Sequence, residues 1–107
     1  MNTIKQVVFR EEDDVFMIVP NEVEVPVIPR YIYDLTVDQQ ATFQALKDFC
    51  LTQVDTLEYT VYTSESNTLD MQPISGTTVS LIVSEMSIDD KALVDNVGDI
   101  CTLLINS

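Results

Sequence analysis

Apolar residues recur at three- and four-residue steps in residues 35–54 and again in residues 86–105, which predicts two amphipathic helices. Each stretch opens with a residue suited to cap a helix. Thr36 forms a capping-box sequence with Gln39, and Ser87 stands at the start of the second stretch. The expected buried faces comprise Phe43, Leu46, Phe49, Cys50 and Val54 in the first helix and Val94, Val97, Ile100, Cys101, Leu104 and Ile105 in the second.

The two helical stretches resemble each other at a constant offset of 51 residues. Similar apolar residues also match at this offset, and no gap is needed. The pattern raises the hypothesis of an internal duplication, with halves 1–54 and 55–107 that each read β-β-β-α. The identical pairs are Asp38 with Asp89, Ala41 with Ala92, Asp48 with Asp99, and Cys50 with Cys101.

Alternating or short apolar runs elsewhere in the chain predict strands. In residues 23–33 the alternation is broken by Pro26 and Pro29, and proline cannot donate to a sheet ladder. That segment is therefore expected to be an edge strand or an extended crossover. The other predicted strands cover residues 3–9, 15–19, 57–63, 69–71 and 77–83.

The predicted strands also carry expectations about their faces. The unbroken apolar run 15–19 suggests a strand that is buried on both sides or central in the sheet. Leu57, Tyr59 and Val61 are expected to share one face of their strand. Val79, Leu81 and Val83 are expected to do the same in the last strand, and Gly98 marks either a close backbone approach or a weak point in the second helix.

These elements predict an α+β fold in one domain spanning residues 1–107, with both helices on one face of an antiparallel sheet of about five or six strands. The longest apolar run has strand length, which argues against a membrane span. The N-terminal residues do not follow the pattern of a secretory signal. We therefore expect a cytoplasmic protein, or one built into a virion that is assembled in the cytoplasm.

The chain carries 18 acidic and 5 basic residues, for a net charge of −13. Such a surface repels nucleic acid and anionic membranes and attracts basic proteins, although it also serves solubility alone. There is no histidine, which excludes Ser-His-Asp triads, Cys-His nucleophiles and histidine-ligated zinc. With only Gly76 and Gly98, the chain also has no phosphate-binding glycine loop. We expect no enzymatic activity and no cofactor.

The acidic run Glu11, Glu12, Asp13 and Asp14 gathers four carboxylates that could hold a metal ion. It lacks the alternation and the glycine of a calcium loop, so a solvated hairpin turn is the favoured interpretation. Cys50 and Cys101 are interpreted as reduced core thiols rather than a disulfide. Four tyrosines in or beside predicted strands suit either a protein interface or ordinary cross-strand packing, namely Tyr31, Tyr33, Tyr59 and Tyr62.

Two functional hypotheses follow. The first is a non-catalytic interaction or assembly protein that docks onto a larger, basic partner, for example as a phage or bacterial accessory or structural component. The second is a nucleic-acid mimic that inhibits a DNA- or RNA-binding enzyme. An even spread of acids with one apolar or tyrosine-lined patch favours assembly, and acids on one face favour the mimic. The mimic would use the acids of the two outer helix faces, Asp38, Asp48, Asp89, Asp95 and Asp99, together with Glu11, Glu12, Asp13 and Asp14.

Overall fold

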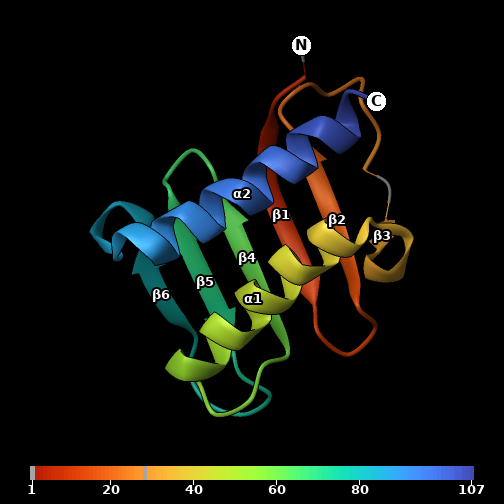
Figure 1. The fold of residues 1–107 in the computed structure, drawn as a ribbon. Coiled ribbons are helices and arrows are strands. Elements are labelled where there is room, and N and C mark those ends of the chain that lie inside the picture. Colours follow the sequence, from red (N-terminus) through yellow and green to blue (C-terminus); the bar gives the residue numbers. More distant parts are fainter. Residues whose placement is uncertain (1, 28) are drawn as a thin grey trace.

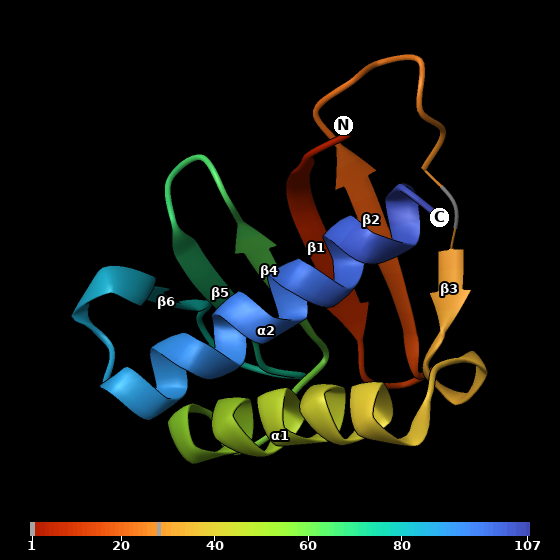
Figure 2. The ribbon, with the colours of Figure 1, turned by 45° about the horizontal axis from the view of Figure 1, so that its top comes forward.

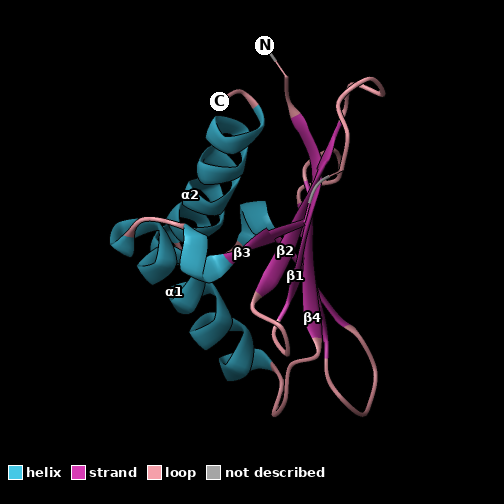
Figure 3. Cartoon of the chain, turned by 90° about the vertical axis from the view of Figure 1, so that its right-hand side faces the viewer, coloured by secondary structure: helices cyan, strands magenta, loops and turns pink. Residues whose placement is uncertain are grey.

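The computed structural model, which describes residues 2–27 and 29–107, has six antiparallel strands in the order β3-β2-β1-β4-β5-β6. Both long helices pack on one face of this sheet, and the other face is uncovered (Figures 1 and 3). This architecture confirms the predicted α+β class. The elements are β1 (Ile4–Arg10), β2 (Val15–Pro20), β3 (Pro29–Tyr31), α1 (Val37–Gln53), β4 (Tyr59–Thr63), β5 (Thr68–Gln72), β6 (Val79–Ile82) and α2 (Ile88–Ile105), with short 3-10 turns η1 (Ile32–Asp34) and η2 (Val83–Glu85).

The helices begin where their capping residues predict. The Thr36 hydroxyl accepts a hydrogen bond from the backbone N–H of Gln39, whose side chain accepts one from the Thr36 N–H in return. The Ser87 hydroxyl accepts from the N–H of Asp90 and donates to its carboxylate. The helices then run in opposite directions across the sheet (Figure 2).

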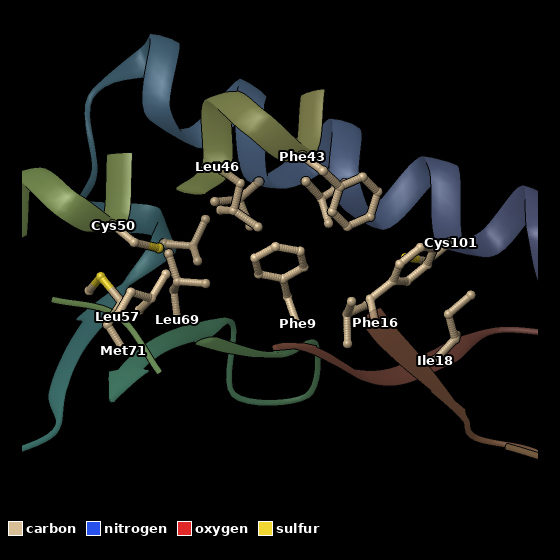
Figure 4. Close-up of a cluster of buried hydrophobic side chains, with 14 of the residues drawn as sticks. Phe9, Phe16, Ile18, Phe43, Leu46, Cys50, Leu57, Leu69, Met71 and Cys101 are labelled. Carbon is tan, nitrogen blue, oxygen red and sulfur yellow. The ribbon is translucent and has the colours of Figure 1, made fainter. Parts of the chain in front are cut away.

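The core lies between the helices and the sheet, and it is aromatic at one end (Figure 4). The ring of Phe43 on α1 packs against Phe16 on β2, with centroids 4.6 Å apart, and against Phe9 on β1 at 6.1 Å. At the other end aliphatic side chains and Met71 fill the same layer. Burying these side chains supplies the main driving force for the fold.

The strand registers of the two halves correspond. In the β1–β2 pair Phe9 lies opposite Phe16, and 53 residues further along the chain Tyr62 lies opposite Leu69 in the β4–β5 pair. For the edge strands and the helices the offset is 51, because the β2–β3 connection is two residues longer than the β5–β6 connection. The offset of 51 found in the helices therefore does not extend to the first two strands of each half.

Individual backbone hydrogen bonds repeat as well. Asp14 and Asn67 both take positive φ angles, 50° and 52°, at the ends of the two hairpin turns. Their carbonyls accept from Ile32 N–H and Val83 N–H respectively, in both cases at 2.9 Å. The two halves thus share one local plan, and their origin by duplication stays a prediction.

The expectations about strand faces were confirmed in part. In β4, Tyr59 and Val61 share one face, as predicted, but it is the uncovered face. Thr60 faces the core, where its hydroxyl donates to the Asp70 carbonyl at 2.7 Å and is satisfied. Leu57 is buried but precedes the strand, so its position does not fix the strand's alternation. β2 is internal to the sheet, yet it is buried on one side only, where Phe16 and Ile18 face the helices.

Candidate partner-binding surfaces

The acidic hairpin turn does not present four free carboxylates. Glu11 pairs with Lys47 of α1 at 2.7 Å, and Asp13 pairs with Arg10 at 2.8 Å. The hydrogen bond from Lys47 to Glu11 raises the pKa of the lysine above its usual value. Glu12 and Asp14 remain exposed. No group of three or more metal-ligating side chains occurs in the described part of the chain.

The five predicted site acids of the two helices are all exposed. Asp38, Asp48 and Asp89 are exposed along the two helices, away from the core. Asp95 and Asp99 line a hollow over Gly98, together with Tyr62 and Ser64. The pKa of the Tyr62 hydroxyl is raised by partial burial and by the nearby Asp95 carboxylate. Asp48 lies near the hairpin turn, because its charge acts on Lys47 together with those of Glu11 and Asp14.

Gly98 does not mark a close backbone approach. A Cβ atom at this position would lie 3.8 Å from Ile4 Cδ1 and 3.9 Å from a ring carbon of Tyr62, which are ordinary contacts. The glycine is therefore a weak point in α2, and it leaves the hollow open.

Tyr31 and Tyr33 lie side by side at the β3 edge of the sheet. Their rings stack with centroids 5.1 Å apart, and the side chains are 43% and 69% exposed. Tyr33 and Asp14 also line a groove against α1, at whose start Val37 is 81% exposed. Of the predicted site residues, the structure thus brings Asp14, Tyr31 and Tyr33 together around η1.

Comparison with protein-family models, with curated proteins and with solved structures finds no match. Within residues 2–27 and 29–107, no helix is long and apolar enough to cross a bilayer.

The thiols do not form a reactive site. Cys50 and Cys101 are both free and fully buried, as expected from their places on the apolar helix faces. Burial raises the pKa of Cys50 to about 11 and that of Cys101 to about 12. Since the thiolate is the nucleophilic form, both groups are inert near neutral pH.

The uncovered face of the sheet differs from the rest of the surface. At its centre Val8 lies between Met17 on β2 and Val61 on β4. Tyr31 and Tyr59 lie on the same face, at the β3 edge and beside Arg10. Asp70 is the single acid among the residues of the six strands, so the other 17 of the 18 acids lie in turns, loops and helices.

Sequence reasoning missed Val8 and Met17 as surface residues. Alternation along a strand divides its residues between two faces, but it does not say which face the helices leave uncovered. The signal that could have found them is the placement of acids, which avoid nearly all strand positions.

Proposed function

We propose that this protein is a non-catalytic assembly protein, which docks onto a larger partner through the uncovered face of its sheet. The observation that carries this proposal is the contrast between that face and the remaining surface. The uncovered face has apolar residues and tyrosines with a single strand acid, whereas the other 17 acids lie in turns, loops and helices. Two of these loop acids, Glu12 and Glu58, line a hollow with Val8 and Tyr59 at one end of this face. Protein interfaces are typically depleted of charge at their centres and enriched in tyrosine.

The chemistry of the face suits packing rather than catalysis. Val8, Met17 and Val61 are half-buried by their neighbours and form a continuous apolar row across three central strands. Tyr59, which is 36% exposed, adds a large side chain with a polar tip. A partner that covers this row would remove apolar surface from water without burying many charges.

The charge of the remaining surface favours a basic partner. A net charge of −13 raises the rate of association with positively charged proteins and opposes contact with nucleic acid. A phage or bacterial assembly is one class of partner that fits. Inhibition by nucleic-acid mimicry has less support, because the acids are spread over turns and both helices.

The test compares two lysine variants in lysate from the source organism. Val61→Lys places a charge at the centre of the uncovered face, where Asp70 opposite can accept it in the folded protein. Leu51→Lys places the same charge on α1, where the leucine is 40% exposed. We expect the wild type and Leu51→Lys to elute in a larger complex on size exclusion, and Val61→Lys to elute as the free protein.

The salt dependence adds a second readout. The complex should weaken but persist as ionic strength rises, since charge assists the docking and apolar burial holds it. A wild-type protein that elutes alone at both low and high salt would contradict the proposal. So would a complex that Val61→Lys leaves intact.

A further inference from the structure

The two edge strands of the sheet differ in their capacity to accept another strand. β3 carries Pro29, which has no N–H, and Pro26 precedes it, so this edge is blocked. β6 has the sequence Val-Ser-Leu-Ile without proline, charge or bulge. Exposed sheet edges without proline, charge or bulge are the usual sites of strand addition.

The register shows which backbone groups of β6 are unpaired. Ser80 lies opposite Asp70 as Pro29 lies opposite Met17, so the two residues occupy equivalent positions. Because Val83 N–H bonds to the Asn67 carbonyl, alternate residues back along β6 face β5 or face away from it. The N–H and C=O groups of Ser80 and Ile82 therefore point away from the sheet.

A groove follows this edge on the helix side of the sheet. It is lined by Ser80, Leu81 and Ile82 of β6 and by side chains from α1, η2 and α2. Phe49 and Met86 supply its apolar surface, while Glu85 and Asp90 supply negative charge. Neither acid forms an ion pair with any residue in the described part of the chain.

The equivalent groove beside β3 is flanked by the chain itself. Val25 and Pro26 of the longer β2–β3 connection line it, and Arg30 stands where Leu81 stands in β6. The first half thus lines its groove with its own loop and carries a positive charge there. The second half has the shorter connection, an open edge and two acids.

We infer that the edge of β6 binds an extended segment of a basic partner protein, which pairs with Ser80 and Ile82 as a seventh strand. Alternate side chains of that segment would enter the groove, with an apolar residue against Phe49, Leu81 and Met86. A lysine or arginine would lie against Glu85 and Asp90. This inference rests on the proposed function for the existence of a partner.

The negative charge beside β6 argues against a second copy of this protein as the added strand. A β6 strand from another molecule would bring its own Glu85 and Asp90 beside those of the first, together with a net charge of −13. No basic residue lies within β6 to offset this repulsion.

The experiment screens the full-length protein against a displayed library of random peptides of about ten residues, a typical strand length. We expect enrichment of peptides with alternating apolar residues and at least one lysine or arginine. With a synthetic peptide from this pool, backbone hydrogen exchange at Ser80 and Ile82 should slow. The pairing uses main-chain groups, so Ser80→Pro should raise Kd about tenfold or more.

Two variants serve as matched controls. Pro29→Ser is the reciprocal exchange at the opposite edge and should leave Kd within about twofold. Glu85→Lys should remove the preference for basic peptides while apolar alternation remains. Thermal unfolding of Ser80→Pro verifies that the sheet is intact.

Several results would overturn the inference. They are the absence of enriched peptides, slowed exchange confined to other elements, or unchanged binding by a folded Ser80→Pro. A dimer of the protein alone that Ser80→Pro dissociates would place a second copy on this edge instead. If Val61→Lys abolishes the complex in lysate and peptides still fail to bind, the edge inference fails and the docking proposal stands.

Discussion

The two halves of the molecule use one backbone plan with different side chains at equivalent surface positions. In the first half Lys47 of α1 reaches Glu11 in an ion pair of 2.7 Å. In the second half Gly98 and Ser64 occupy the corresponding positions, and a hollow lined by Asp95 and Asp99 is found there. The backbone arrangement of each half therefore does not depend on the ion pair. The turn geometry and the helix caps are the features that both halves share.

The interiors of the halves differ in the same way. Phe9, Phe16 and Phe43 form the aromatic cluster of the first half, and their equivalents are Tyr62, Leu69 and Val94. One part of the core is thus built around three phenyl rings that pack at tilted angles, whereas only one of their equivalents, Tyr62, is aromatic (Figure 4). The same sheet geometry accepts both, provided that the layer stays filled.

The largest expected effect is a loss of stability, and it is tested by comparing Phe43→Ala with Val94→Ala. Both side chains are 1% exposed at equivalent helix positions. The first variant should lower the free energy of unfolding by about 3 to 5 kcal/mol and the second by about 2 kcal/mol, because less apolar volume is lost. Urea denaturation measures both. Equal losses would show that the two ends of the core are energetically alike despite their different composition.

The next effect appears at alkaline pH and compares the two thiols. Their folded pKa values of about 11 for Cys50 and about 12 for Cys101 lie above the ordinary value of 9.0. The unfolded chain therefore loses these protons first. The contribution of the thiols to the free energy of unfolding is fully present below pH 9, and it is lost as the pH rises toward the folded pKa values. The loss is about 1.4 kcal/mol per pH unit for each thiol.

Single alanine variants separate the two contributions to that fall. Cys50→Ala should flatten the decline in unfolding free energy between pH 9 and 11, and Cys101→Ala should flatten it up to pH 12. Tyrosine ionisation is common to all variants and cancels in the differences. A decline as steep in both variants as in the wild type would contradict the assignment.

The smallest effect concerns the surface position at which the halves differ most. Gly98→Ala should raise the free energy of unfolding by about 0.5 to 1 kcal/mol, because the new methyl group meets only ordinary contacts and the helix gains propensity. Lys47→Ala should lower it by less than about 1 kcal/mol, as expected for a partly exposed ion pair. Thermal unfolding measures both. A destabilised Gly98→Ala would show that the hollow is under packing constraints.

Local features of the fold could be predicted from the sequence because they depend on near neighbours. The capping positions Thr36 and Ser87, the first hairpin turn and the proline-limited edge strand were all confirmed. Tyr59 and Val61 share a face as predicted, but the sequence did not show that Thr60 would face the core, where it bonds to Asp70, ten residues away. Alternation of apolar residues does not carry that information.

The candidate surfaces were less predictable than the fold. Tyr31 and Tyr33 could be grouped because they are near neighbours along the chain. By contrast, Glu11 was read as a solvated acid because nothing in the sequence connects it with Lys47, 36 residues away. The uncovered face and the open β6 edge arise only once the strand order is known.

The seam between β1 and β4 has a consequence for the kinetics of folding. It is the only strand pairing among the described residues that joins the two halves, and it brings together residues as distant in the sequence as Gln6 and Thr63. Hairpins form within microseconds, whereas closing so long a loop carries a larger entropic cost. The rate-limiting step of folding should therefore be the pairing of β1 with β4, after the hairpins β1–β2 and β4–β5 have formed.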